Sequence, residues 1–293
     1  MYSIHNNSSQ WPGLQLFWNK FLKMFVAIDF GITNTDVAVN QNGDDIFYSF
    51  PSRSITNEFI GYIFNEIDLD FVNLRKIGVT GGKSSNLSSS YKDVPISKIN
   101  EEEAIGRGAM ALYDIYDESF VAVSTGTGTA CIHHSNSKFN YLGGISVGGG
   151  TLQGLSKYLI STENAKDIEE LAKKGDRKEL DFLIGDVVNE VGSLNQDITA
   201  SNFGKAKNNE NTSKEDTAAS LSNMIGEIIG TISYLNALLC NENKVYFLGR
   251  TSLNKVIKTA IEDRLKLANI SGVFKENREY GNVLGALRSI QSD

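Results

Sequence analysis

The chain has little of the chemistry on which disulfide-bonded, zinc-binding or membrane-spanning proteins depend. It holds only two cysteines, Cys131 and Cys240, and three histidines in 293 residues. Each cysteine lies in an apolar run, so we expect buried free thiols in a reducing compartment rather than a disulfide framework. No apolar run reaches the roughly 18 residues that a membrane span requires. We therefore expect a cytoplasmic protein with no membrane partner.

Positive charge is also scarce. The formal net charge is -7, and no block of basic residues occurs anywhere in the chain. Proteins that bind the nucleic-acid backbone do so with clustered lysine and arginine, so we expect no nucleic-acid partner. An anionic small molecule would have to be held by local hydrogen-bond donors. The length favours one large domain or two of moderate size.

One stretch, residues 120–154, organises the rest of the chain. Residues 120–123 and 130–132 read as buried strands, and the sequence Ser-Thr-Gly-Thr-Gly-Thr lies between them at residues 124–129. A second glycine-rich turn follows at residues 143–154 and leads into a helical pattern. Glycine allows close backbone approach, and serine and threonine hydroxyls add donors, so the pair of turns favours a phosphate chain. The alternative is two tight hairpin turns.

A third turn of this kind covers residues 29–35, directly after the strand predicted at residues 25–28. Asp29 ends that strand, and a carboxylate there can place a hydrated Mg²⁺ beside phosphates. Locally, a turn cap is an equally good interpretation of Asp29. Residues 81–85 resemble part of a P-loop, but the upstream glycine spacing is wrong and no helix follows at once. We therefore exclude a P-loop.

The order of predicted elements is strands and helices, then strands and helices again, with a glycine turn after the first strand of each half. This α/β pattern predicts two similar lobes with a cleft between them. We divide the chain into an N-terminal extension (1–23), an N-terminal lobe (24–118) and a C-terminal lobe (119–293). The extension is either a leader before a true start at Met24, or a short amphipathic segment that docks on a surface or partner.

Three consecutive acids, Glu101, Glu102 and Glu103, open a helix predicted to end near Tyr113. The helix dipole favours acidic residues in a first turn, and Asn100 with Glu103 fits a capping box. Of the three acids, Glu101 is the one whose presence these structural roles explain least.

Taken together, the motifs resemble the actin/hexokinase/Hsp70-type ATPase superfamily and, more narrowly, the type II pantothenate kinases. The resemblance runs from Met24 to about Ser289 and is carried by residues 29–35, 79–82, 101–108, 124–129, 143–154, 174–177, 197–204 and 281–287. It implies a two-lobed actin-like ATPase (ribonuclease H-like) fold with a central cleft. It also implies an ATP- and Mg²⁺-dependent kinase of a primary alcohol, most simply pantothenate, that acts as a homodimer with an acyl-CoA as a feedback ligand.

The resemblance assigns site residues by position. Glu101 aligns with the catalytic carboxylate, and Asp29 is the candidate metal ligand. The expected ATP contacts are Gly31, Ile32, Thr33, Asn34, Thr35, Thr125, Gly126, Thr127, Gly128, Thr129, Gly148, Gly149, Gly150 and Gln153. The expected substrate contacts are Tyr141, Gly143, Thr199, Ala200 and Arg264.

Three positions depart from the family pattern. Asp36 stands where relatives carry lysine, Tyr141 where they carry arginine, and Arg264 where a tyrosine lines the pantothenate pocket. Because cationic clamps neutralise charge on a transferred phosphoryl group, another cation would have to substitute. The candidates are Lys83, Arg107 and Arg250. Two further functions therefore stay open, namely a kinase of another small alcohol or amino sugar, and a nucleotide- or acyl-CoA-binding regulator with little turnover.

Overall fold

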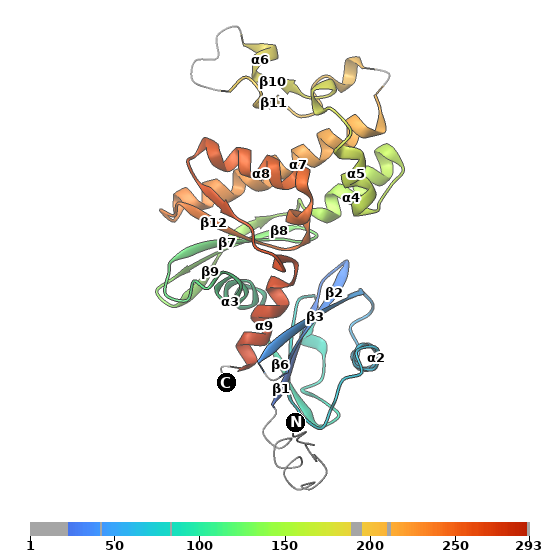
Figure 1. Ribbon diagram of the computed structural model, residues 1–293, viewed down its shortest axis with the longest axis vertical. Helices are drawn as coiled ribbons and strands as arrows, with labels where there is room; N and C mark the ends of the chain where they lie inside the picture. Colours follow the sequence, from blue (N-terminus) through green and yellow to red (C-terminus); the bar gives the residue numbers. More distant parts are fainter. Residues whose placement is uncertain (1–22, 42, 83, 189–194, 210–211, 292–293) are drawn as a thin grey trace, which may run out of the picture. The chain divides into compact units, whose positions relative to one another are not determined.

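The computed structural model describes residues 23–41, 43–82, 84–188, 195–209 and 212–291, and the chain divides into two compact units (Figure 1). The first unit comprises Met1–Asn100 with Ala286–Asp293, and the second comprises Glu101–Gly285. The lobe boundary drawn from the sequence, between residues 118 and 119, thus differs from the division in the structure. Residues 1–22 of the N-terminal extension lie outside the described residues, so both interpretations of it remain predictions.

The first unit is built on a six-stranded mixed sheet of order β3-β2-β1-β4-β6-β5. Strands β1, β2 and β3 form an antiparallel meander, and β4 and β6 continue the sheet in parallel with β1. The elements are β1 (Met24–Phe30), β2 (Asn34–Gln41), β3 (Asp44–Pro51), α2 (Asn57–Glu66), β4 (Leu74–Thr80), η1 (Ser84–Asn86), β5 (Ser90–Tyr91) and β6 (Val94–Lys98).

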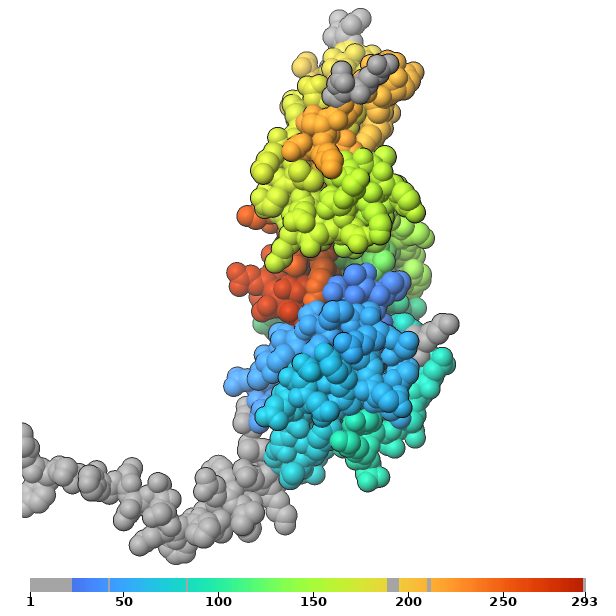
Figure 2. All heavy atoms as spheres, turned by 90° about the vertical axis from the view of Figure 1, so that its right-hand side faces the viewer, coloured from blue at the N-terminus to red at the C-terminus, as the bar shows by residue number. Residues whose placement is uncertain are grey.

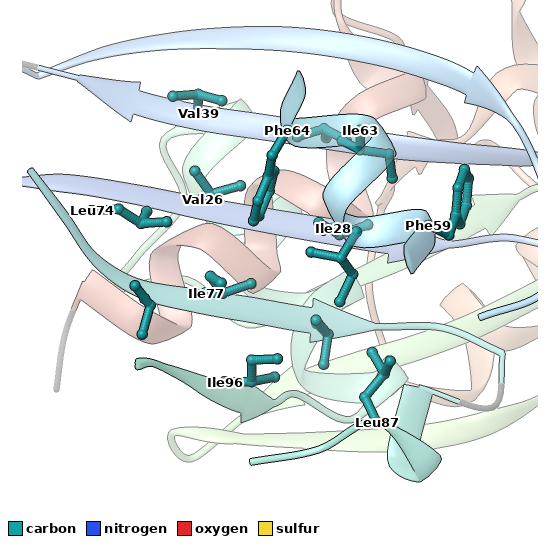
Figure 3. Packing of buried hydrophobic residues seen from close by; sticks show 14 of the residues in the cluster. Val26, Ile28, Val39, Phe59, Ile63, Phe64, Leu74, Ile77, Leu87 and Ile96 are labelled. Atoms are coloured by element: carbon teal, nitrogen blue, oxygen red, sulfur yellow. The ribbon is translucent and has the colours of Figure 1, made fainter. Parts of the chain in front are cut away.

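The core of the first unit lies between this sheet and α2 (Figure 3). Val26 and Ile28 alternate along β1 and point to the side where Phe59 and Phe64 of α2 pack. The helix begins where the Thr56 hydroxyl accepts a hydrogen bond from the backbone N–H of Phe59, at 3.2 Å. Strand alternation and a helix with one apolar face therefore meet in a single core.

The end of the chain completes the other face of the first sheet. Helix α9 (Gly281–Gln291) passes from the second unit into the first. Ile290 packs against Gly78 of β4, where an added Cβ would lie 3.1 Å from the Ile290 side chain. Arg288 forms an ion pair with Asp45 of β3. These contacts explain why residues 286–293 belong with the first unit, although they are distant from it in sequence.

The second unit holds a five-stranded sheet of order β13-β12-β7-β8-β9. An antiparallel meander is again followed by parallel strands, so its topology repeats the order β6-β4-β1-β2-β3 of the first unit. This repetition confirms the predicted two-lobed fold. The strands are β7 (Phe120–Thr125), β8 (Thr129–Ser135), β9 (Lys138–Ile145), β12 (Lys244–Leu248) and β13 (Ser271–Val273).

Helices cover both faces of the second sheet. Val121 and Val123 of β7 belong to the core formed with α7 (Lys214–Leu239) and α8 (Lys255–Leu267). Phe120 points the other way and contacts Tyr246, which in turn packs against Tyr113 of α3 (Glu101–Tyr113). Figure 1 shows α3 on the side of the sheet opposite to α7 and α8. Burial on both faces explains why β7 is an apolar run rather than an alternating one.

Glycines allow α7 and α8 to approach closely. A Cβ at Gly226 would lie 2.6 Å from the Ile257 carbonyl oxygen, and one at Gly230 would lie 2.9 Å from that of Ile261. The four-residue spacing of these glycines in the sequence therefore has its cause in helix packing.

A smaller region extends the second unit beyond α4 (Gly149–Ile160). It contains a two-stranded sheet, short helices and the N-terminal end of α7, and α4 and α5 form a continuous part of the surface in Figure 2. Its elements are α5 (Ala165–Ala172), η2 (Arg177–Glu179), β10 (Phe182–Leu183), α6 (Ile184–Val187), β11 (Thr199–Ser201) and η3 (Ala206–Asn208).

The described residues offer no helix that is both long and apolar enough to cross a membrane. Both cysteines are free thiols. Cys131 is buried as expected, and its burial raises the pKa of the thiol to about 11. Cys240 is only half-buried.

Candidate functional site

The turn between β7 and β8 packs directly on the N-terminal end of α4. The backbone N–H of Gly149 donates to the Gly126 carbonyl at 2.9 Å, and that of Gly150 donates to the Thr127 carbonyl at 3.0 Å. A Cβ at Gly148 would lie 2.7 to 2.9 Å from the carbonyl oxygens of residues 126–128. The two glycine-rich stretches of the sequence therefore form one backbone-on-backbone structure, and Gly148 is needed for the fold itself.

Gly126 differs from Gly148 because the protein leaves room beside it, whereas the space beside Gly128 is tight. A Cβ at Gly126 would meet only the Gly128 carbonyl oxygen, at 3.9 Å, and a Cβ at Gly128 would meet only that of Ile145, at 3.3 Å. Gly126 is exposed, and Thr127 and Gly128 are half-buried. Internal packing thus gives little reason for glycine at 126. An outer group that approaches the backbone closely, such as a phosphate, would give one.

The two buried threonines at the ends of this turn have structural partners. The Thr125 hydroxyl donates to the Leu248 carbonyl at 2.8 Å, and the Thr129 hydroxyl donates to the Val147 carbonyl at 2.8 Å. Both hydroxyls therefore hold the turn in place from inside the unit.

A third segment, which the sequence analysis did not assign to the site, also contacts the turn between β7 and β8. The η4 helix (Arg250–Leu253) follows β12, and its Thr251 hydroxyl donates to the Gly126 carbonyl at 2.7 Å. The backbone N–H of Ser252 donates to the Thr125 hydroxyl at 3.2 Å. Gly249, with φ +89°, precedes them and would place a Cβ 2.4 Å from the Thr125 carbonyl oxygen. The signal available in the sequence was a glycine directly after the apolar run at residues 245–248.

The expected nucleoside contact Gln153 lies on α4, half-buried. Its side-chain amide donates to the Glu163 carbonyl at 3.0 Å, which links α4 to the loop before α5.

Glu101 is the first residue of α3 and is exposed. Within the described residues its carboxylate makes no hydrogen bond or ion pair. Glu103, two residues later, accepts a hydrogen bond from Arg107 Nε at 2.8 Å. Glu101 therefore keeps a carboxylate that the helix does not use, whereas Glu103 is part of an ion pair on the helix surface.

That ion pair also engages one of the candidate cations, Arg107. The guanidinium of Arg250 lies over the Tyr280 ring, 5.5 Å from its centroid. Lys83 lies outside the described residues.

Tyr141 and Gly143 flank a β-bulge on the edge strand β9. Ile132 pairs with Tyr141 and Cys131 pairs with Gly143, so Leu142 is an extra residue in the ladder. Gly143 adopts φ +117°, and Tyr141 is 54% exposed. Bulges redirect side chains and are common beside binding sites, which is compatible with the substrate role expected of Tyr141.

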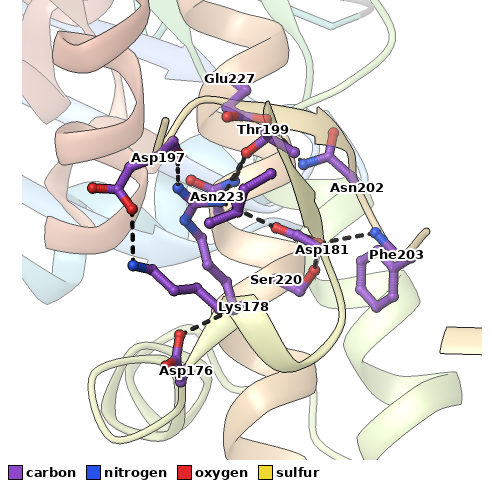
Figure 4. Close-up of polar contacts among 12 residues, drawn as sticks. Asp176, Lys178, Asp181, Asp197, Thr199, Asn202, Phe203, Ser220, Asn223 and Glu227 are labelled. Carbon is purple, nitrogen blue, oxygen red and sulfur yellow. Dashed lines mark hydrogen bonds and ion pairs between the residues drawn. The ribbon is translucent and has the colours of Figure 1, made fainter. Parts of the chain in front are cut away.

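Thr199 and Ala200 lie on β11, in a polar network made by η2 and α7 (Figure 4). The Thr199 hydroxyl accepts hydrogen bonds from Arg177 Nη1 at 2.8 Å and from Asn223 Nδ2 at 3.4 Å. Ala200 is exposed. The sequence analysis assigned no role to Arg177 beyond its motif and did not single out Asn223.

Arg264 of α8, another expected substrate contact, has a partner within its own unit. Its Nη2 atom lies 3.0 Å from Glu227 Oε1 on α7, and Glu227 Oε2 accepts a hydrogen bond from Asn202 at 2.9 Å. The positive charge of Arg264 is thus compensated locally.

In the first unit, the turn between β1 and β2 is tied to the end of β3. The Ser52 hydroxyl donates to the Gly31 carbonyl at 2.6 Å and lies 3.2 Å from the Thr35 hydroxyl. A Cβ at Gly31 would lie 2.6 Å from the Asn34 carbonyl oxygen. Ile32 and Thr33 are exposed at the tip of the turn, and Asn34 is half-buried.

Asp29 and Asp36 are paired across β1 and β2, so their side chains lie on the same face of the sheet. Asp29 is half-buried, whereas Asp36 is 6% exposed and accepts a hydrogen bond from the Ser49 hydroxyl at 2.8 Å. No cluster of three or more metal-binding side chains exists among the described residues. Any metal here would need ligands from a bound molecule as well.

The sequence is similar to that of known protein families and relatives. Residues 113–262 match the Fumble protein family. A type II pantothenate kinase of Bacillus cereus (strain ATCC 10987 / NRS 248) is 33% identical over 273 residues, covering 89% of this chain and 96% of that protein. A type II pantothenate kinase of Bacillus anthracis is 31% identical over 274 residues, with the same coverage.

Solved structures agree on the fold. The activator of the 2-hydroxyisocaproyl-CoA dehydratase from Clostridium difficile, with bound ADPNP, has a TM-score of 0.63 at 16% identity, covering 93% of this chain and 97% of that one. A ROK family glucokinase from Streptomyces griseus, in complex with glucose and AMPPNP, has a TM-score of 0.60 at 11% identity, covering 92% and 100%.

Proposed function

Because the chain belongs to the type II pantothenate kinase family, we propose that it transfers a phosphoryl group from ATP to the primary hydroxyl of pantothenate. The products are ADP and 4′-phosphopantothenate, and the reaction opens coenzyme A synthesis. The observation that carries the proposal is the identity of 33% with a type II pantothenate kinase across 89% of the chain.

The nucleotide is assigned to the glycine-rich turns. Residues 126–129 hold the β- and γ-phosphates, residues 148–150 and Gln153 flank the nucleoside, and residues 31–35 contact the γ-phosphate. What supports the first assignment is the open space beside Gly126, combined with the rigid backing that Thr251 and α4 give to the turn. Such a turn presents backbone dipoles without reorganisation, which is the main source of phosphate stabilisation in phosphoryl transfer.

Asp29 is the proposed Mg²⁺ ligand. Its carboxylate is half-buried at the end of β1, and the paired Asp36 adds negative charge on the same face of the sheet. Mg²⁺ is usually held by one or two carboxylates together with substrate phosphates, so the absence of a larger acidic cluster among the described residues fits this ion. When bound, the metal would neutralise charge on the phosphates.

Glu101 is the proposed general base. Its carboxylate orients the hydroxyl of pantothenate and accepts its proton as the new oxygen–phosphorus bond forms and the bond to ADP breaks. The support from the structure is that Glu101 is exposed and uncommitted, whereas Glu103 is paired with Arg107.

The remaining parts of the proposal rest on the family resemblance. The protein acts as a homodimer in the cytoplasm, and an acyl-CoA acts as a feedback ligand. The residues that contact the substrate are Tyr141, Gly143, Thr199, Ala200 and Arg264. Arg264 would do so while its guanidinium also pairs with Glu227.

Asp36 favours a second candidate, a kinase of another small alcohol or amino sugar, because the lysine expected at this position is replaced by a buried acid. A coupled assay of ADP release, with Mg-ATP and a panel of pantothenate, hexoses and amino sugars, decides between the two. Turnover with pantothenate at the highest kcat/KM supports the proposal. Preferential turnover of a sugar contradicts it, and ATP binding without turnover of any alcohol would indicate a regulator.

A further inference from the structure

We propose that Arg250 is the cation that binds the β- and γ-phosphates of the nucleotide and offsets the negative charge on the transferred phosphoryl group. Arg250 is a catalytic residue in this inference, and Tyr280 and Arg278 are positioning residues. The inference rests on the proposed function for the place of the phosphates, and adds the side chain that supplies positive charge to them.

Two segments far along the chain contact the proposed phosphate turn within the second unit. The Thr251 hydroxyl of η4 donates to the Gly126 carbonyl at 2.7 Å. The Ser124 hydroxyl, at the start of the turn, donates to Asn282 Oδ1 at 3.1 Å. Asn282 follows the η5 helix (Arg278–Tyr280) directly at the start of α9. Side chains of η4 and η5 are therefore candidates to meet a phosphate bound at the turn.

These segments hold two cationic side chains. The segments at the turn are residues 124–129, 145–153, 249–253 and 278–282. Their lysine and arginine residues are Arg250 and Arg278 alone. Arg278 uses its N–H groups inside the fold, because Nε and Nη2 donate to the hydroxyl and carbonyl of Ser252, and Nη1 donates to the Lys275 carbonyl, each at 2.9 Å. Arg278 therefore holds η4 in place, and Arg250 is the other positive charge at the turn.

Arg250 is held at both ends of its side chain. Its backbone follows Gly249, which has φ +89° and donates its N–H to the Arg278 carbonyl at 2.8 Å. Its half-buried guanidinium lies over the Tyr280 ring, 5.5 Å from the centroid. A guanidinium in such a contact presents its flat face to the ring, whereas its N–H groups lie in the guanidinium plane and can bind two phosphate oxygens at once.

Of the cations that the sequence offers to the transferred phosphoryl group, Arg107 is engaged elsewhere. Its Nε atom lies 2.8 Å from Glu103 Oε1, four residues earlier on α3. Arg250, in contrast, directly precedes Thr251, whose hydroxyl contacts the turn. The contacts within the second unit therefore favour Arg250 over Arg107.

The chemistry of the reaction explains what Arg250 would contribute. The bond between the γ-phosphorus and the bridging oxygen of ADP breaks as the bond to the alcohol oxygen forms, and Arg250 takes no proton and forms no covalent bond. The backbone of the turn offers dipoles without net charge, whereas a guanidinium keeps a full positive charge at any working pH. A fixed charge acts most strongly where negative charge develops during the reaction, so we expect Arg250 to affect kcat more than ATP binding.

The test measures nucleotide affinity by calorimetry with no alcohol present. Arg250→Gln removes the charge and keeps a polar side chain. We expect the Kd of ATP to rise about tenfold or more, the scale of a charge-assisted hydrogen bond. The Kd of AMP, which lacks the β- and γ-phosphates, should not change. With the identified alcohol, kcat should fall by about 10²-fold, and Arg250→Lys should recover part of both losses because it keeps the charge without the planar fork.

Tyr280→Leu tests the positioning of the guanidinium. Loss of the ring should raise the Kd of ATP about threefold, the scale of a cation–π contact, and leave the Kd of AMP unchanged. Combined with Arg250→Gln it should add nothing, because Tyr280 acts on the phosphates only through Arg250. Additive effects in the double variant would contradict this role of Tyr280.

Lys258→Gln is the matched control. It removes the same charge from the same unit, and Lys258 makes a cation–π contact of its own on α8, 5.0 Å from the centroid of the Phe274 ring. An equal rise in the Kd of ATP for Lys258→Gln would overturn the inference in favour of a general charge effect. An equal rise for ATP and AMP in Arg250→Gln would overturn it in favour of a disturbed fold. A loss confined to Arg107→Gln or Lys83→Gln would assign the role to that residue instead.

Nucleotide affinity also separates this inference from the proposed function, because it does not depend on the alcohol. If the chain binds ATP but phosphorylates a sugar in place of pantothenate, the proposed function fails and the ATP and AMP measurements still decide on Arg250. If the chain phosphorylates pantothenate and Arg250→Gln leaves the Kd of ATP and kcat unchanged, the inference fails and the function stands.

Discussion

The hydroxyl of Thr251 donates a hydrogen bond to the carbonyl oxygen of Gly126, 2.7 Å away and 125 residues earlier in the chain. The same carbonyl also accepts the backbone N–H of Gly149, at 2.9 Å. One oxygen atom therefore joins the turn after β7, the turn after β12 and the start of α4. The shape of the proposed phosphate turn depends on all three segments.

Replacing Thr251 by valine should loosen this turn. Loss of one hydrogen bond of this kind costs about 1 kcal/mol, which corresponds to a fall in Tm of about 2–4 °C for a chain region of this size. We expect ATP affinity to fall as well, whereas Thr251→Ser should keep both. Thermal denaturation and ATP titration measure the two effects, and wild-type ATP affinity in Thr251→Val would separate η4 from the phosphate turn.

Two single alanine substitutions should distinguish a structural glycine from a ligand-facing one. In Gly148→Ala the new Cβ would lie within 2.9 Å of three backbone carbonyl oxygens, so we expect a large fall in Tm or a chain that does not fold. In Gly126→Ala the Cβ meets only an oxygen at 3.9 Å, so the fold and Tm should be retained.

ATP binding by the Gly126→Ala variant tests whether residues 126–129 hold phosphate. If a phosphate approaches this backbone, Gly126→Ala should weaken ATP binding while circular dichroism and Tm remain those of the wild type. A well-folded Gly126→Ala with normal ATP affinity would argue against residues 126–129 as the phosphate site.

Among the three acids that open α3, only Glu101 should matter for catalysis. Glu101→Gln keeps the shape but cannot accept a proton, so we expect kcat to fall by roughly 10²-fold or more, with ATP binding intact. Glu103→Gln alters a partly exposed ion pair with Arg107 and should cost little. Steady-state kinetics on the identified substrate test both variants. An inactive Glu103→Gln beside an active Glu101→Gln would show that the alignment at this helix is shifted.

Asp181 should give the second unit a distinctive dependence of stability on pH. The pKa of the Asp181 carboxyl is raised above its ordinary value, and burial is the largest cause of this shift. The folded state therefore keeps a proton that the unfolded chain releases above about pH 3.9, so this group lowers the free energy of unfolding as pH rises from there through its folded pKa. Asp181→Asn cannot titrate, and its Tm relative to wild type should increase across that range.

Asp197→Asn provides the comparison of opposite sign. The hydrogen bond from Lys178 lowers the pKa of the Asp197 carboxyl, so its stabilisation is present above the unfolded pKa and is lost as pH falls through the folded one. The Tm of Asp197→Asn relative to wild type should therefore decrease as pH rises. Parallel pH series of Tm for the two variants would test this, and curves of the same sign would contradict the assignment for Asp181.

Much of the fold could be predicted from local sequence. The apolar runs predicted β1, β7 and β8, and the run of acids at residues 101–103 predicted the start of α3. These features are set by nearest neighbours along the chain, since strand alternation, helix periodicity and glycine sterics act within a few residues. The family resemblance added the order of the lobes.

The lobe boundary could not be found this way. Helix α3 follows the first-unit strands directly in sequence but packs beneath the second sheet, and residues 286–291 return to Gly78 and Asp45 of the first. Which sheet a helix covers is decided by long-range packing, and a local pattern carries no information about it.

The sequence by itself determined which residue types stand at the proposed site, namely glycines and threonines in three turns and three consecutive acids at the start of α3. Only the tertiary structure decided which of these residues form hydrogen bonds within the fold and with which partners. It showed that the hydroxyls of Thr125 and Thr129 are used within the fold, that Thr251 donates a hydrogen bond to the turn, and that Arg177 and Asn223 donate hydrogen bonds to the Thr199 hydroxyl. The physical reason is that hydrogen bonds join whichever donors and acceptors folding brings within about 3 Å, however far apart they lie in the chain.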